Sequence, residues 1–186
     1  RQFDTDIIIN QNINAEKLNY NCVNKPQLLL GRNYALLRKN ILKAKRAENA
    51  QRIMISFGGG DVYSRIELSL QWFEDINERL NHSIEIDLVL AVTPTQLRVI
   101  QKIFNQFKKL KVNYITNSYD LSKVMSQTDF AITAAGSTVF ELAHMGVPQI
   151  AFMIDENQEI TGSKINEHGF GTCLGYLEDV FKDDFV

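Results

Sequence analysis

From residue 52 onward, short apolar runs alternate with longer segments in which apolar residues recur at every third or fourth position. The runs predict buried strands at 53–57, 86–90, 112–115, 130–132, 149–153 and 171–174. The longer segments predict helices near 66–80, 97–107, 119–126, 137–145 and 158–167. Strands that alternate with helices indicate right-handed βαβ units. We therefore predict an α/β fold with a doubly wound parallel, Rossmann-like sheet.

The first 50 residues have a different pattern. The apolar run at 6–10 predicts one short buried strand, with no partner strand nearby in the sequence. A polar, Asn-rich stretch follows, and a basic segment that ends near Arg46 predicts a helix. We interpret 1–50 as the end of a preceding domain plus an interdomain linker, and 51–186 as the Rossmann-like domain. The start at Arg1 rather than Met fits a fragment of a longer protein.

Composition and charge exclude several classes of function. Hydrophobic residues make up 45% of the 186 residues. The 20 Lys+Arg against 22 Asp+Glu leave a net charge of −2, so no basic surface is expected to hold nucleic acid. Cys22 and Cys173 form neither a metal motif nor a disulfide framework, which favours a reduced, cytoplasmic setting. We expect no membrane span, since no apolar run approaches ~20 residues, and no metal site, since the histidines lack ligand spacing.

A glycine-rich loop follows the first predicted strand of the domain. Gly58, Gly59, Gly60 and Asp61 separate that strand from the next helix, where glycines let a backbone approach a phosphate or a sugar closely. The loop is not a P-loop, and Tyr63 replaces the third glycine of a dinucleotide-binding motif. A tight turn that needs glycine for its geometry is the structural alternative.

A second turn carries a stronger signal. Gly136, Ser137 and Thr138 open a short helix, and Ser137 is expected to cap it through its hydroxyl, leaving other N–H groups for a phosphate. Glu141 lies four residues after Ser137 on the same helix face, where its carboxylate would accept hydrogen bonds from both ribose hydroxyls. The alternative role of Glu141 is to complement the helix dipole.

Two side-chain amides follow the next strand. Asn157 and Gln158 offer donors and acceptors that suit sugar hydroxyls or N-acetyl groups. On local sequence alone, helix capping by Asn157 is the favoured alternative.

These motifs together resemble the C-terminal half of a GT-B nucleotide-sugar enzyme, and most of all the UDP-sugar hydrolases of pseudaminic acid biosynthesis, which are related to spore-coat polysaccharide proteins. The resemblance covers nearly the whole chain. It rests on Asn-Gln at 10–11, Leu-Gly-Arg-Asn-Tyr-Ala-Leu-Leu-Arg at 30–38, Ile-Ser-Phe-Gly-Gly-Gly-Asp at 55–61, Ala-Ala-Gly-Ser-Thr-Val-Phe-Glu-Leu at 134–142 and Asn-Gln at 157–158. The resemblance implies the UDP-binding domain of an enzyme that releases UDP from a deoxysugar nucleotide.

The resemblance also implies residue roles. The backbone at 136–138 would hold the diphosphate, Glu141 the ribose, and residues 157–158 the phosphate or the sugar, while the loop at 58–61 would face the interdomain cleft. Uracil would rest on the backbone near Ile132 and Thr133 or near Ser118 and Tyr119. Tyr34 and Arg38 would belong to a hinge-side segment that closes the cleft.

One departure from the family limits the expected activity. The catalytic histidine of that family lies in a Gly-His turn of the N-terminal domain, and this sequence has no such turn. We therefore expect no catalytic residue in this chain and no hydrolysis by it alone; the missing N-terminal domain is the expected partner. A UDP-sugar is the expected substrate, with no cofactor. A donor-binding domain of a glycosyltransferase and a non-catalytic nucleotide-sugar sensing domain are the alternatives.

Overall fold

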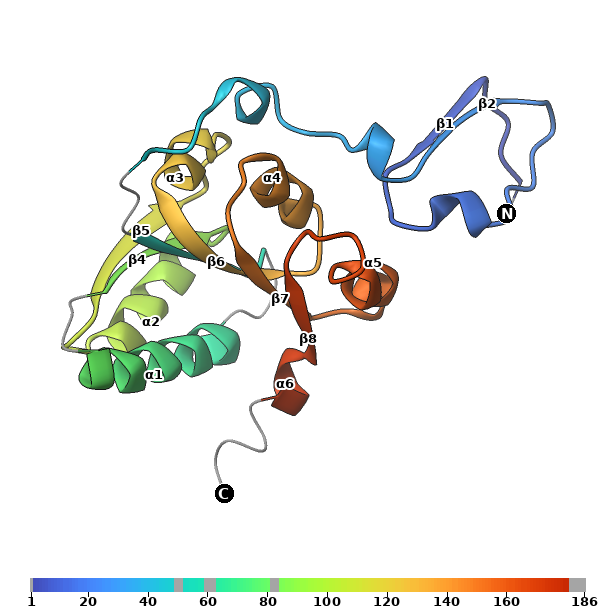
Figure 1. Ribbon diagram of the computed structural model, residues 1–186. Coiled ribbons are helices and arrows are strands. Elements are labelled where there is room, and N and C mark those ends of the chain that lie inside the picture. The colour runs from blue at the N-terminus through green and yellow to red at the C-terminus, as the bar shows by residue number, and fades with distance from the viewer. Residues whose placement is uncertain (1, 49–51, 59–62, 81–83, 181–186) are drawn as a thin grey trace.

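Six parallel strands form the central sheet in the order β5-β4-β3-β6-β7-β8. The computed structural model describes residues 2–48, 52–58, 63–80 and 84–180 (Figure 1). The strands are β3 (Arg52–Ser56), β4 (Glu85–Leu90), β5 (Lys111–Thr116), β6 (Thr128–Ala134), β7 (Gln149–Met153) and β8 (Thr172–Tyr176). The chain builds outward from β3 to β5 and then returns to the other side of β3 with β6. This order confirms the predicted doubly wound sheet.

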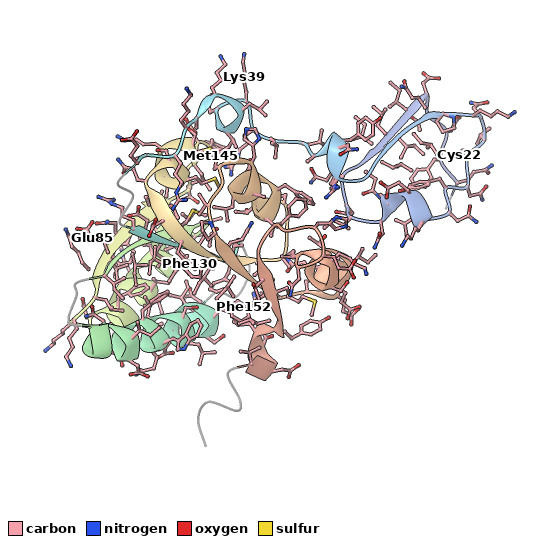
Figure 2. All side chains as sticks on the ribbon, viewed as in Figure 1. Cys22, Lys39, Glu85, Phe130, Met145 and Phe152 are labelled. Carbon is pink, nitrogen blue, oxygen red and sulfur yellow. The ribbon has the colours of Figure 1, made fainter. Side chains whose placement is uncertain are left out.

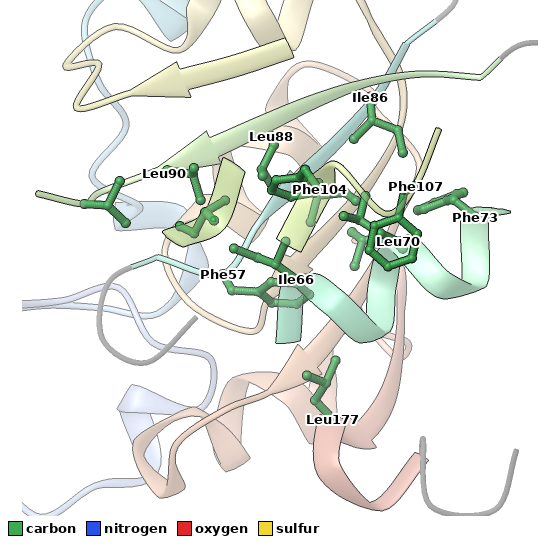
Figure 3. Packing of buried hydrophobic residues seen from close by; sticks show 14 of the residues in the cluster. Phe57, Ile66, Leu70, Phe73, Ile86, Leu88, Leu90, Phe104, Phe107 and Leu177 are labelled. Carbon is green, nitrogen blue, oxygen red and sulfur yellow. The ribbon is translucent and has the colours of Figure 1, made fainter. Parts of the chain in front are cut away.

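Helices pack on both faces of the sheet (Figure 1). They are α1 (Tyr63–Leu80), α2 (Pro94–Phe104), α3 (Ser122–Ser126), α4 (Thr138–His144), α5 (Glu159–Lys164) and α6 (Leu177–Val180). On one face, apolar residues of α1 and α2 pack against β3 and β4, as Figure 3 shows for Ile66, Leu70, Phe104, Leu88 and Phe57. On the other face, α3 and α4 cover Met54 and Ala131. Because helices cover both faces of the sheet, inner strands such as β3 and β7 are mostly apolar and largely buried.

The N-terminal residues form a separate small parallel sheet. Strand β1 (Ile7–Asn10) pairs with β2 (Gln27–Leu30), and the 3-10 turns η1 (Ala15–Lys17) and η2 (Arg32–Tyr34) accompany them. A third 3-10 turn, η3 (Ile41–Lys43), packs against the large sheet's helix α4. The expectation of a buried strand without a nearby partner is wrong on both points. Ile7 and Ile9 are 49% and 50% exposed, and in the described part of the chain β1 pairs with β2 alone (Figure 1).

The segment after η2 crosses from the small sheet to the large one. The helix expected to end near Arg46 is reduced to the single turn η3, and Ala44 is already extended. Tertiary contacts hold this shape: Ile41 is fully buried in the cluster that contains Met54, and Arg46 Nη2 donates to Asp129 Oδ1 at 2.6 Å. In Figure 2 Met145 lies beneath this segment, whereas the side chain of Lys39 points away from the domain.

The last strand carries a tyrosine with a perturbed titration. The Tyr176 hydroxyl donates to Glu159 Oε1 at 2.7 Å, and this bond, with burial and the nearby carboxylates, raises the pKa of Tyr176 from 10.0 to about 12. Because the folded pKa lies above the ordinary value, the bond contributes stability below pH 10, and this contribution is lost as the pH rises through about 12.

We expect Glu159→Gln to lower the titration midpoint of Tyr176, as measured by the ultraviolet absorbance of phenolate. An unchanged titration curve would contradict the assignment.

Candidate functional site

The candidate site lies at the carboxyl ends of β3 and β6, where the strand order reverses. These two strands are neighbours, Ser56 pairs with Thr133 in the register, and Thr133 Oγ1 donates to the carbonyl oxygen of Ser56 at 3.1 Å. In doubly wound sheets the loops that leave such a pair of strands diverge to opposite faces and open a crevice between them. The two glycine turns singled out in the sequence both follow these strands.

Two cavities open at this edge of the sheet. The first, here called the Arg38 cavity, has a volume of about 390 Å³ and is lined by Leu36, Arg38, Leu90, Asn117, Ser118, Leu121 and Glu141 among others. The second, the Gln158 cavity, has a volume of about 470 Å³ and is lined by Arg65, Thr133, Gly136, Ile154, Asn157 and Gln158 among others. Ser56, Gly58, Ser137 and Thr138 line both cavities, so they form a shared wall between them.

Glu141 is buried, and its carboxylate is held by an arginine from the N-terminal segment. Glu141 is 5% exposed. Arg38 Nε donates to Oε1 at 2.6 Å, Arg38 Nη2 donates to Oε2, and the backbone N–H of Arg38 donates to Oε1 at 3.3 Å. The hydrogen bond to Glu141 raises the pKa of the Arg38 guanidinium, although partial burial opposes the rise. The ion pair gives the buried carboxylate the partner that a charge in this position needs.

In the turn before α4, two backbone N–H groups have no acceptor among the described residues. Gly136 N–H bonds the Ala134 oxygen, and the N–H groups of Val139 and Phe140 also have acceptors within the turn. Among the described residues, the N–H groups of Ser137 and Thr138 have none. Ser137 is the N-cap residue, but its hydroxyl makes no capping hydrogen bond, so the prediction of a hydroxyl cap is wrong. Its helical φ of −62° and ψ of −26° differ from the extended backbone that lets a capping hydroxyl reach the next turn.

The loop after β7 brings an amide side chain to this turn. Gln158 Oε1 accepts from the N–H of Ile154 at 3.1 Å, and its Nε2 lies 3.8 Å from the position that a Cβ on Gly136 would take. The cap in this loop comes from Asp155, whose Oδ1 accepts from the N–H of Asn157 at 3.0 Å, so the capping role considered for Asn157 is wrong. An aspartate two residues earlier reaches that N–H through an Asx turn.

The structure also places the remaining predicted residues. Gly58 lines both cavities with a φ of +76°, a left-handed conformation that favours glycine. Gly59, Gly60 and Asp61 lie outside the described residues. Ser118 lines the Arg38 cavity and Thr133 the Gln158 cavity. Ile132 is 1% exposed inside the core and Tyr119 is 96% exposed, and neither lines the Arg38 cavity or the Gln158 cavity.

Sequence reasoning missed several lining residues, among them Arg65 and Asn117. Arg65 Nη2 donates to the Ile154 oxygen at 3.5 Å and Arg65 Nε lies 3.5 Å from Glu178 Oε1. Asn117 has a φ of 49° and donates through Nδ2 to the Val92 oxygen at 2.9 Å. An asparagine directly after a strand is a usable signal, because asparagine tolerates the left-handed region. For Arg65, the one signal in the sequence is a charged side chain at the start of a helix.

Other candidate chemistry does not assemble. In the described ranges no group of three or more His, Cys, Asp or Glu residues could hold a metal ion. His168 Nδ1 lies 3.0 Å from Arg32 Nη1, which links η2 to the α5–β8 loop, away from both cavities. Within the described part of the chain, no helix has the length and apolar character to cross a membrane.

Comparison with known proteins identifies the fold. No family model matches the chain. Over 166 residues it is 26% identical to "Uncharacterized protein MJ1062" of Methanocaldococcus jannaschii, a match that covers 82% of this chain and 33% of that protein. The structure is similar to MurG of Acinetobacter baumannii, with a TM-score of 0.56, 16% identity, and coverage of 97% of this chain and 52% of MurG.

A second solved structure agrees. WaaG, a glycosyltransferase involved in lipopolysaccharide biosynthesis, matches 71% of this chain and 36% of its own length, with a TM-score of 0.52 and 16% identity. The chain thus spans about a third of the curated relative and about half of MurG. Its six-stranded parallel sheet with flanking helices has the Rossmann-like fold of GT-B glycosyltransferase domains.

Proposed function

We propose that this chain is the nucleotide-sugar binding domain of a glycosyl-transfer type enzyme and that its ligand is a UDP-sugar. The observation that carries the proposal is the shared wall of the two cavities. Ser137 and Thr138 present open N–H groups there, beside Gly58 and at the point where the strand order reverses. Backbone donors in a crevice at this point favour a phosphate group.

A nucleotide sugar has three parts, and the site offers a place for each. The diphosphate would lie against the shared wall, near the N–H groups of Ser137 and Thr138. The nucleoside would occupy the Arg38 cavity, which contains Glu141 for the ribose and the apolar side chain of Leu121 with Ser118 for the base. The sugar would occupy the Gln158 cavity, where side-chain amides and the guanidinium of Arg65 provide hydrogen-bond donors.

For the reaction we propose hydrolysis of the UDP-sugar, as in the enzymes of pseudaminic acid or surface-polysaccharide biosynthesis that the sequence motifs resemble. The role of this chain would be to bind the UDP leaving group with preorganised N–H groups, which stabilise negative charge as it develops. The group that activates water would come from a further domain, and no cofactor would take part. Sugar transfer to an acceptor is the alternative reaction, supported by the fold that the chain shares with WaaG. A non-catalytic sensing role is the second alternative.

Calorimetric titration of the chain with UDP, CDP, GDP, ADP and TDP tests the proposal. We expect UDP to bind and the other diphosphates to bind more weakly. Equal binding of all five would retain the diphosphate site but remove the assignment of uracil. Binding by none of them would contradict the proposed function of this chain.

The ribose assignment has its own test. We expect Glu141→Ala to weaken UDP binding by about 1–3 kcal/mol, because a hydrogen bond from a ribose hydroxyl to a carboxylate is lost. The measurement is the same titration, with thermal unfolding as a check that the variant is folded. Unchanged affinity together with a loss of stability would assign Glu141 to the ion pair with Arg38 and to the helix dipole instead.

A further inference from the structure

The carboxylate of Glu141 has little free capacity to accept hydrogen bonds. An ionised carboxylate offers about four acceptor positions on its two oxygens. Arg38 fills two of them on Oε1, through its backbone N–H and Nε, and one on Oε2, through Nη2. Among the described residues no other donor bonds this carboxylate, so one position on Oε2 remains open. Both residues line the same cavity.

Electrostatics favours an Arg38 that stays in place when a nucleotide binds. A diphosphate would bring further negative charge into a site that already contains the carboxylate of Glu141, which is 5% exposed. If neutral ribose hydroxyls displaced the guanidinium, the Glu141 carboxylate would be left buried without a countercharge, a state that costs several kcal/mol. The side chain of Arg38 is 36% exposed, and its Nη1 has no acceptor among the described residues. The cation thus faces the cavity while it holds the carboxylate.

We propose that Arg38 is a positioning residue for nucleotide binding: it holds the Glu141 carboxylate so that a single acceptor position remains for one ribose hydroxyl. The inference rests on the proposed function, since it takes the Arg38 cavity to be the nucleoside site. It makes the segment before β3 part of that site, although Arg38 and Glu141 are 103 residues apart in the sequence. The sequence predicts that Glu141 accepts hydrogen bonds from both ribose hydroxyls. The inference is instead that Glu141 accepts a hydrogen bond from one of them.

The test compares UDP with its 2′-deoxy and 3′-deoxy analogues by calorimetric titration of the full chain. With the unsubstituted protein, we expect one analogue to bind roughly tenfold more weakly than UDP and the other to bind like UDP, because one hydroxyl has an acceptor. Loss of affinity for both analogues would overturn the inference, since Glu141 would then accept two hydroxyls and Arg38 would have moved away.

Variants separate positioning from a structural role. We expect Arg38→Ala to bind UDP roughly tenfold more weakly and to lose the discrimination between the analogues. Arg38→Lys, which keeps the charge but not the planar fork, is expected to recover part of the affinity and is the variant to use if Arg38→Ala does not fold. Arg46→Ala is the matched control, because Arg46 lies in the same segment but pairs with Asp129 outside both cavities.

The outcomes distinguish the inference from the proposed function. If Arg38→Ala and Arg38→Lys bind UDP as tightly as the unsubstituted chain, or keep its discrimination, Arg38 does not position Glu141 and only the inference fails. Tighter UDP binding by Arg38→Ala would show that Arg38 competes with the ribose, and this too overturns the inference alone. If the unsubstituted chain binds no nucleotide, the proposed function and the inference fail together.

Discussion

Gly171→Ala is expected to destabilise the fold by about 3–4 kcal/mol. A Cβ on Gly171 would lie 2.5 Å from the backbone oxygen of Gln149 and 2.6 Å from Gln149 Cγ. The backbone oxygen cannot move without disturbing the start of β7, and overpacking of this kind costs about 1–3 kcal/mol. The φ of +153° adds strain for any residue with a side chain. Urea unfolding followed by circular dichroism measures the loss.

Gly169→Ala is the matched control for Gly171→Ala. Gly169 also has a positive φ, of +68°, but a Cβ there meets none of the described atoms within 4 Å. We expect Gly169→Ala to cost about 1–2 kcal/mol, the strain of the left-handed conformation alone. Equal losses for the two variants would show that backbone strain explains both and that the contact with Gln149 has no effect.

The strands of the large sheet could be predicted from the sequence because each has an apolar run, and the inner strands β3, β4, β6 and β7 are largely buried. Each apolar run from residue 53 to residue 174 corresponds to a strand of the structure. The same reasoning failed for the run that became β1, where Ile9 is 50% exposed. An apolar run predicts a strand, but its burial depends on what packs against it, and in the described residues β1 has β2 as its one partner.

Helix prediction failed where tertiary contacts outweighed local preference. The basic residues before β3 favour a helix, yet the chain forms the single turn η3 there, and Ala44 is already extended. Burial of Ile41 and the hydrogen bonds of Arg46 to Asp129 and to the Gly146 oxygen hold it in that form. Helix propensity contributes less than about 1 kcal/mol per residue, so a few such contacts are enough to override it.

At the candidate site, the sequence predicted which helix or loop carries each residue. It did not predict which other residues those side chains would contact. The position of Glu141 on α4 follows from the periodicity of one helix, and the structure places it in the wall of a cavity. Its pairing with Arg38 depends on how a distant segment crosses the domain, and no local pattern encodes such a contact. The Ser137 cap failed for a related reason, because capping depends on a backbone conformation that the residue type favours without determining it.

Gly136→Asp is expected to reduce UDP affinity by at least about 100-fold without unfolding the domain. Gly136 does not adopt a positive φ, and the described atom nearest to an added Cβ, Gln158 Nε2, lies at 3.8 Å, an ordinary contact distance. A side chain is therefore tolerated there. If the diphosphate binds at the neighbouring N–H groups, a carboxylate at this position lies within a few ångströms of it. Two like charges 4 Å apart near a protein surface repel by about 4 kcal/mol.

Gly136→Asn separates charge from bulk, because asparagine and aspartate have nearly the same shape. We expect Gly136→Asn to bind UDP far more tightly than Gly136→Asp, and the difference to shrink as salt screens the repulsion. Thermal unfolding should give both variants a stability within about 1 kcal/mol of the unsubstituted chain, as for a substitution without a steric contact. If both variants bind UDP equally at low salt, the phosphates do not lie beside Gly136. The wall shared by the two cavities would then have a role other than binding the diphosphate.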